Sequence, residues 1–151
     1  MPEPAADASR KIRVILTRRE HFSASHRLWN PEQDERWNRE TYGPCSNLNG
    51  HGHNYILEVS IQGYPDASGM IVNLKDIKKV LFDKIINHVD HKHLNHDVPF
   101  LQGIIPTTEN VLLAFWRELA PEYPEGALCR LVLRETEKNM VEICLASMGG
   151  G

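Results

Sequence analysis

The chain has 151 residues, of which 41% are apolar and 25% are charged, and its formal net charge is −3 at pH 7. These values are typical of one globular domain, and they argue against nucleic-acid binding. No apolar run reaches the roughly 18 residues of a membrane helix, and residues 1–10 lack the apolar segment of a secretory signal. We expect a disordered tail over 1–10, one domain over 11–146 and a flexible tail over 147–151.

The three cysteines point to a reducing compartment. An odd number of cysteines in a chain without an export signal predicts free thiols, and therefore a cytoplasmic protein. Cys129 and Cys144 lie in apolar, strand-like runs, which favours inert core residues. Cys45 lies instead in a polar loop beside histidines.

The first half of the chain predicts two strands. Residues 11–26 are rich in β-branched residues, and residues 53–63 alternate between apolar and polar. Between them, Asn30-Pro31 is a turn signal, and residues 32–40 favour a short surface helix. Residues 70–72 read as a short extended run.

The second half predicts two helices and two strands, over 74–87, 107–120, 127–135 and 140–146. Asn73 is a good N-cap for the first helix, and apolar residues follow it at helical spacing. The order of elements predicts an α+β fold with a four-stranded antiparallel sheet and both helices on one face. Because such a sheet has long open edges, we expect pairing between subunits and a homo-oligomer.

Three histidines form a candidate metal site. In a strand, His51 and His53 lie on the same face with Cα atoms roughly 7 Å apart. His26 can join them if the first two strands pair, and three imidazoles without a fourth protein ligand are typical of catalytic zinc. Cys45 is then either a fourth ligand of a structural site or a reactive thiolate beside the metal.

Two other segments carry candidate chemistry. Asp90-His91 is either a proton-transfer pair or a helix C-terminal cap with exposed imidazoles. Glu135 ends an apolar strand, where it either caps a turn or binds a planar ligand with two adjacent N–H donors. Glu109 is favourable in the first turn of its helix for dipole reasons alone.

Taken together, these segments resemble the 6-pyruvoyl-tetrahydropterin synthase family. The resemblance covers about residues 13–143 and is carried, in family order, by 22–28, Cys45 with 49–55, 90–92, 106–110 and 135–136. It implies a tunnelling fold (T-fold), in which three subunits close a twelve-stranded β-barrel and two trimers stack into a homohexamer.

The resemblance also implies roles for individual residues. It implies that Zn²⁺ is bound by His26, His51 and His53. It implies that Cys45 is the catalytic base, with Asp90 and His91 as relay partners, in a site shared between subunits. It implies that the pterin is bound by Glu135, with Thr107, Thr108 and Glu109 lining its pocket.

The implied reaction converts 7,8-dihydroneopterin triphosphate to 6-pyruvoyl-tetrahydropterin with elimination of triphosphate. This is a carbon–oxygen lyase step of tetrahydrobiopterin biosynthesis. One alternative is 6-carboxy-tetrahydropterin synthase of queuosine biosynthesis, where the cysteine typically precedes the His-x-His pair by four residues rather than the six between Cys45 and His51. The other is a non-catalytic, zinc-stabilised pterin-binding oligomer in which Cys45 ligates zinc.

Overall fold

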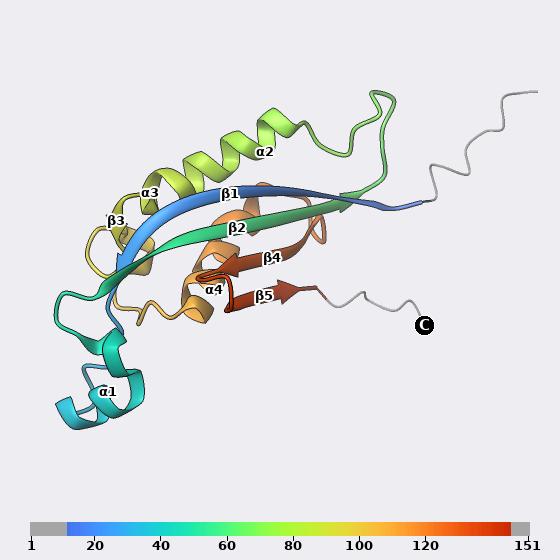
Figure 1. Ribbon diagram of the computed structural model, residues 1–151. Helices are drawn as coiled ribbons and strands as arrows, with labels where there is room; N and C mark the ends of the chain where they lie inside the picture. The colour runs from blue at the N-terminus through green and yellow to red at the C-terminus, as the bar shows by residue number, and fades with distance from the viewer. Residues whose placement is uncertain (1–11, 146–151) are drawn as a thin grey trace, which may run out of the picture.

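Two long antiparallel strands, β1 (Val14–His26) and β2 (His51–Gly63), form the central part of the sheet (Figure 1). The computed structural model describes residues 12–145. The tails predicted over 1–10 and 147–151 lie outside this range. Within it, no helix has the length and apolar character needed to cross a membrane.

The other elements occupy the connections between strands and the second half of the chain. They are α1 (Glu35–Tyr42), η2 (Gly43–Ser46), α2 (Leu74–Leu81), η3 (Phe82–Ile86), α3 (Asn87–Val89), β3 (Lys92–His93), η4 (Pro99–Leu101), α4 (Thr108–Leu119), η5 (Ala120–Glu122), β4 (Leu128–Arg134) and β5 (Met140–Cys144). The predicted α+β class is therefore confirmed.

The sheet differs from the prediction in strand number and direction. It has five strands in the order β3-β1-β2-β4-β5, and β3 runs parallel to β1, whereas a four-stranded antiparallel sheet was expected. The two-residue strand β3 is held by backbone hydrogen bonds, in which His91 N–H donates to Ser23 O and Leu94 N–H to Ser25 O. A strand of two residues is too short to be predicted from side-chain periodicity.

Three further expectations are corrected. The 70–72 segment contains a bend and belongs to no strand. The helix predicted over 74–87 is interrupted by a π-helical turn at η3, a distortion that periodicity alone does not reveal. Cys129 is buried as expected, but Cys144 is exposed because it lies on the outer face of β5.

One face of the sheet packs against α2 and α4 to form the core. Alternate residues of β1 point into this core, including Phe22, which stacks on Tyr55 with ring centroids 4.8 Å apart. Phe115 of α4 meets Phe22 edge-on at 5.9 Å. Each such buried aromatic contributes about 1.5–3 kcal/mol to stability. The same alternation carries His26 to the core face at the end of the strand.

The opposite face of the sheet contains a buried carboxylate. Glu58 is only 6% exposed. Its side chain forms an ion pair with Arg19 at 2.5 Å, and Arg134 and Arg130 lie 3.7 and 3.8 Å away. A buried charge is stable only when it is paired in this way. The cluster anchors the end of β4, immediately before Glu135.

The 27–50 connection between β1 and β2 projects beyond the sheet and carries α1, which lies apart from α2 and α4 (Figure 1). Asp34 caps α1 by accepting a hydrogen bond from Trp37 N–H at 2.7 Å. Asn38 is fully buried, and its amide group hydrogen-bonds backbone atoms of Asn30 and Asp34. These hydrogen bonds hold α1 in place, and the η2 turn that contains Cys45 follows α1 directly.

Gly50 should be essential to the junction between this connection and β2. Its φ is +67°, and an added Cβ would collide with the carbonyl oxygen of His26. Gly69 has a similar φ of +81° but open space around it. We expect Gly69→Ala to lower the free energy of unfolding by about 1 kcal/mol from backbone strain. Gly50→Ala should lower it by about 3 kcal/mol, because collision is added to strain.

Chemical denaturation of both variants at the same protein concentration measures the difference. If both variants lose the same free energy of unfolding, the close approach of Gly50 to His26 does not contribute to the cost of the substitution.

Candidate active site

The β1–β2 register brings three imidazoles together. His26 lies directly opposite His51, and His53 is two residues further along β2 on the same face. One ligand atom from each side chain lies within 4.8 Å of the others. The Nε2 atoms of His26 and His51 are 3.2 Å apart. Two nitrogens bound tetrahedrally to one zinc ion would be about 3.3 Å apart, so this spacing fits a common ion.

Burial and hydrogen bonding prepare His26 as a ligand. The ring nitrogen Nδ1 of His26 lies 2.8 Å from the carbonyl oxygen of Pro106, which can only accept. Nδ1 therefore carries the proton, and Nε2 presents its lone pair toward His51. Burial lowers the pKa of both His26 and His53, so that these imidazoles are neutral at neutral pH. Neutral imidazole is the form that binds metals.

His53 supplies the clearest sign of a missing partner. Its Nε2 atom is buried, and no hydrogen-bond partner for it exists within residues 12–145. The nearest acidic oxygen, Oε1 of Glu135, is 3.3 Å away but not in hydrogen-bonding geometry. A buried polar atom without a partner is costly, and a metal ion in this position would satisfy it. The three residues thus fit the metal implied by the resemblance.

Cys45 lies beside this group without joining it. The compact set of possible ligands contains the three histidines alone among the described residues. Burial raises the pKa of the Cys45 thiol, and the negative charge of Glu135 raises it further. The pKa of the buried Tyr55 is also raised, mainly by burial and then by the charges of Glu135 and Cys45. Thiol, carboxylate and imidazoles therefore share one electrostatic environment.

The predicted pterin-binding residues line one pocket. Thr107, Thr108, Glu109 and Glu135 border a cavity of about 440 Å³. The Thr108 hydroxyl donates a hydrogen bond to Oε2 of Glu135, which orients that carboxylate. Thr107 caps α4 by accepting from Asn110 N–H. The pocket therefore has a carboxylate with a fixed orientation close to the three imidazoles. Substrate binding by these four residues stays a prediction.

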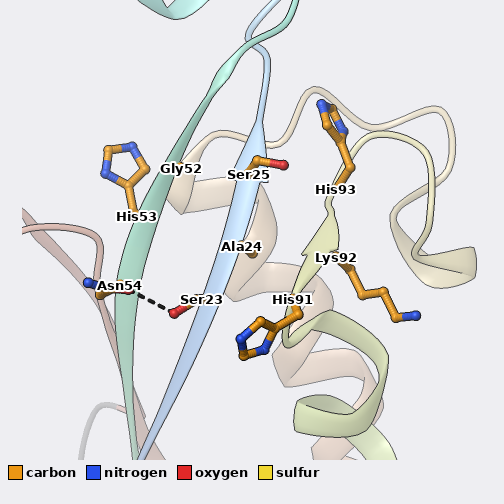
Figure 2. A pocket seen from close by; sticks show the side chains of 9 residues that line it. All are labelled: Ser23, Ala24, Ser25, Gly52, His53, Asn54, His91, Lys92 and His93. Atoms are coloured by element: carbon orange, nitrogen blue, oxygen red, sulfur yellow. Dashed lines mark hydrogen bonds between the residues drawn. The ribbon is translucent and has the colours of Figure 1, made fainter.

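Asp90 and His91 lie elsewhere. The Asp90 carboxylate accepts a hydrogen bond from Ser23 N–H at 2.9 Å and lies 3.0 Å from Nδ1 of His91. His91 lines a pocket of about 420 Å³ that is also bordered by Ser25, Asn54 and His53. Figure 2 shows the ring of His91 beside β1 and that of His53 beyond β2, with both strands between them. His91 is not a member of the compact group formed by His26, His51 and His53.

His91 has an unusual backbone conformation. It is the one non-glycine residue with a positive φ, +59°, within the described range. Histidine adopts this region more readily than most residues, but the conformation still costs energy. Hydrogen bonds from His91 N–H to Ser23 O and from Ser23 N–H to Asp90 compensate. The Asp90-His91 pair is therefore held rigidly at the sheet edge.

Sequence reasoning missed two contributors to the site. Tyr55 is buried with its hydroxyl 3.5 Å from Nδ1 of His26, and its place two residues after His53 could have indicated this. The carbonyl of Pro106 comes from a loop 80 residues away in the chain, and no sequence pattern announces a backbone acceptor.

A two-layer α+β domain with three gathered imidazoles, an oriented carboxylate and a half-buried thiol has the features of a metalloenzyme. Comparison with known proteins identifies the family. Residues 15–144 match the family described as 6-pyruvoyl tetrahydropterin synthase. The chain belongs to this family, and the family prediction made from the sequence is confirmed.

Individual relatives support the assignment. The chain is 42% identical over 137 residues to the 6-pyruvoyl tetrahydrobiopterin synthase of Pongo abelii, covering 90% of this chain and 94% of that one. It is 45% identical to the enzyme of the same name from Dictyostelium discoideum, over 85% and 93% of the two chains. The solved structure of Caenorhabditis elegans 6-pyruvoyl tetrahydropterin synthase matches with a TM-score of 0.83 and 34% identity, covering 91% of this chain and 99% of that chain. Relatives with these names are lyases that act on phosphates, as was predicted for this chain.

Metal binding should depend on His51. We expect His51→Ala to weaken zinc binding by more than about 100-fold, because it removes one of three ligands and leaves a site with two. The metal content per subunit, measured by atomic emission after dialysis, should fall well below one. His88→Ala is the control, since His88 is exposed and contacts the backbone of Asp83. Full zinc in His51→Ala would show that the ligand set is wrong.

Glu135 should control the ionisation of Cys45. Because the Glu135 charge raises the pKa of the thiol, Glu135→Gln should move thiolate formation to lower pH. The rate of Cys45 alkylation by iodoacetamide, followed from pH 6 to 10 in chelator-treated protein, should therefore rise at lower pH in the variant. Glu109→Gln makes the same change at an exposed position of the same pocket and should leave the profile unaltered. An unchanged Glu135→Gln profile would contradict the electrostatic coupling.

Proposed function

We propose that the chain is a zinc-dependent 6-pyruvoyl-tetrahydropterin synthase that converts 7,8-dihydroneopterin triphosphate to 6-pyruvoyl-tetrahydropterin and triphosphate. The observation that carries the proposal is the convergence of three imidazoles, the Glu135 carboxylate and the Cys45 thiol at one end of the sheet. Three free thiols suit the reducing cytoplasm, where we place the protein.

Glu135 would orient the pterin. Its carboxylate, held by Thr108, can accept two hydrogen bonds from the adjacent N–H donors of an amino-pyrimidinone edge. The pterin then lies in the pocket bordered by Thr107 and Glu109, with its side chain extending toward the imidazoles. When bound by His26, His51 and His53, zinc supplies Lewis acidity and a template for the side-chain hydroxyls.

Cys45 would remove the proton from the side-chain carbon, after which triphosphate leaves by elimination and tautomerisation gives the diketo product. The thiol must first lose its own proton, which burial and the Glu135 charge oppose. Pairing of Glu135 with the N–H donors of the pterin reduces that opposition, because the carboxylate charge is then partly neutralised. Substrate binding therefore favours the thiolate.

Asp90 and His91 would act from a second copy of the chain. In Figure 2 the ring of His91 lies beside β1 and the ring of His53 lies beyond β2, so we place the relay to Cys45 across a subunit boundary. We propose a homohexamer of two trimers, in which the edges of neighbouring sheets pair into a twelve-stranded barrel. Such pairing also covers strand edges that would otherwise promote aggregation.

Two alternative functions differ from this one in testable ways. A 6-carboxy-tetrahydropterin synthase would cleave the side chain to a carboxylate; the six-residue spacing from Cys45 to His51 favours the pyruvoyl branch. A zinc-stabilised binding protein would use Cys45 as a ligand. The compact ligand group, which contains three histidines and leaves Cys45 outside, supports the enzyme.

The product of the reaction should decide between these functions. Incubation of the zinc-loaded protein with 7,8-dihydroneopterin triphosphate should give a product whose mass corresponds to the three-carbon diketo side chain. A carboxylate product would support the 6-carboxy alternative, and unchanged substrate would support the binding protein. Cys45→Ala should keep zinc and oligomeric state but lower kcat by about 10²–10⁴-fold, as expected for loss of a catalytic base. Loss of zinc from this variant would instead identify Cys45 as a ligand.

A further inference from the structure

The η2 turn that carries Cys45 is held by the two residues that follow the ligand His26. Leu28 N–H donates to the carbonyl oxygen of Cys45 at 2.8 Å. The Nε–H group of Arg27 donates to the carbonyl oxygen of Ser46 at 2.9 Å. Two consecutive carbonyls of the turn are therefore bonded to the 27–28 segment. The position of the thiol is thereby tied to the strand that presents His26.

Arg27 is itself held from both ends. The amide of Asn95 accepts from Arg27 N–H and donates to Arg27 O, both at 2.8 Å, which fixes the backbone. The guanidinium lies over the ring of Trp29, with its carbon 4.1 Å from the ring centroid. A planar guanidinium stacked on an aromatic ring loses little further entropy when it forms a hydrogen bond. Arg27 is therefore a pre-oriented donor.

The hydrogen bonds donated by the Ser46 hydroxyl, Asn47 N–H and Gly50 N–H lie within the 43–50 segment itself. Ser46 is buried, but its hydroxyl donates to Gly43 O within the same turn. Asn47 N–H likewise bonds to Pro44 O, and Gly50 N–H to Asn47 O. These bonds set the local shape of the 43–50 segment without connecting it to β1. Hydrogen bonds from Arg27 and Leu28 connect Ser46 and Cys45 to the residues that follow β1, and Gly50 approaches the carbonyl of His26 closely.

We propose that Arg27 is a positioning residue that holds the Cys45 thiol in register with the three-imidazole group. The inference rests on the proposed role of Cys45 as a base. Arg27 acts through the carbonyl of Ser46 and is not among the residues that border the pocket around Glu135. Since small displacements of a catalytic group strongly reduce rates, removal of this support should affect kcat more than KM.

The test compares Arg27→Met, Arg27→Lys and Arg36→Ala in zinc-loaded, full-length protein. Arg27→Met keeps an apolar stem against Trp29 but removes every N–H donor. Arg27→Lys restores one donor at the end of the stem. Arg36→Ala removes one exposed guanidinium, which pairs with Glu40 on α1, and serves as the control for charge.

In Arg27→Met, we expect kcat to fall about 10–100-fold while KM changes less than about threefold and zinc stays at one per subunit. The rate of Cys45 alkylation, measured by peptide mass, should rise more than about threefold because the turn is released. Alkylation of the exposed Cys144 should not change and provides an internal reference. Arg27→Lys should recover most of both effects, and Arg36→Ala should match the wild type.

An unchanged Cys45 alkylation rate in folded Arg27→Met would overturn the proposal, as would loss of zinc in parallel with activity. If Arg27→Met does not fold, Arg27→Lys must keep kcat and the alkylation rate within about fivefold of the wild type; a folded Arg27→Lys protein with fully accessible Cys45 would also overturn it. If the wild type does not convert the pterin, the proposed function fails. The alkylation comparison then still tests the positioning of the thiol.

Discussion

The three-imidazole group depends on the register in which β1 pairs with β2. A shift of one residue would turn His51 and His53 to the opposite face and separate them from His26. Packing along both strands fixes this register. Phe22 and Tyr55 are paired and stacked in the core, and the hydroxyls of Thr17 and Ser60 are 2.7 Å apart on the polar face. The site is thus determined by ordinary sheet packing along the whole length of the two strands.

Burial has opposite consequences for the two kinds of group at this end of the sheet. It keeps His26 and His53 neutral and therefore able to bind a metal ion. It also opposes ionisation of Cys45, and the charge of Glu135 adds to that effect. A thiolate in such surroundings needs a nearby positive charge or neutralisation of the carboxylate. The environment that suits the imidazoles to metal binding therefore makes ionisation of the thiol depend on what is bound beside it.

The sequence by itself determined the class of fold, both helices of the core and the same-face placement of His51 and His53. These features follow from local periodicity and capping, which act over a few residues. The combination of His26, Cys45 and Glu135 with their flanking motifs was specific enough to indicate the family. The strand β3 and the π-helical turn at η3 were not predicted, since neither has a periodic side-chain pattern. The exposure of Cys144 was missed although β5 alternates, which places Cys144 on the same exposed face as Glu142.

Only the tertiary structure decided how these residues meet. The acceptor at Pro106 and the support of the η2 turn by Arg27 are hydrogen bonds to backbone carbonyls, which every residue has and no motif marks. The position of Asp90-His91 beside β1 depends on the parallel pairing of β3 at the sheet edge. The candidate residues could be recognised from the sequence because their chemistry depends on residue type and local spacing. The distances between them could not be predicted, because these distances are set by packing between segments far apart in the sequence.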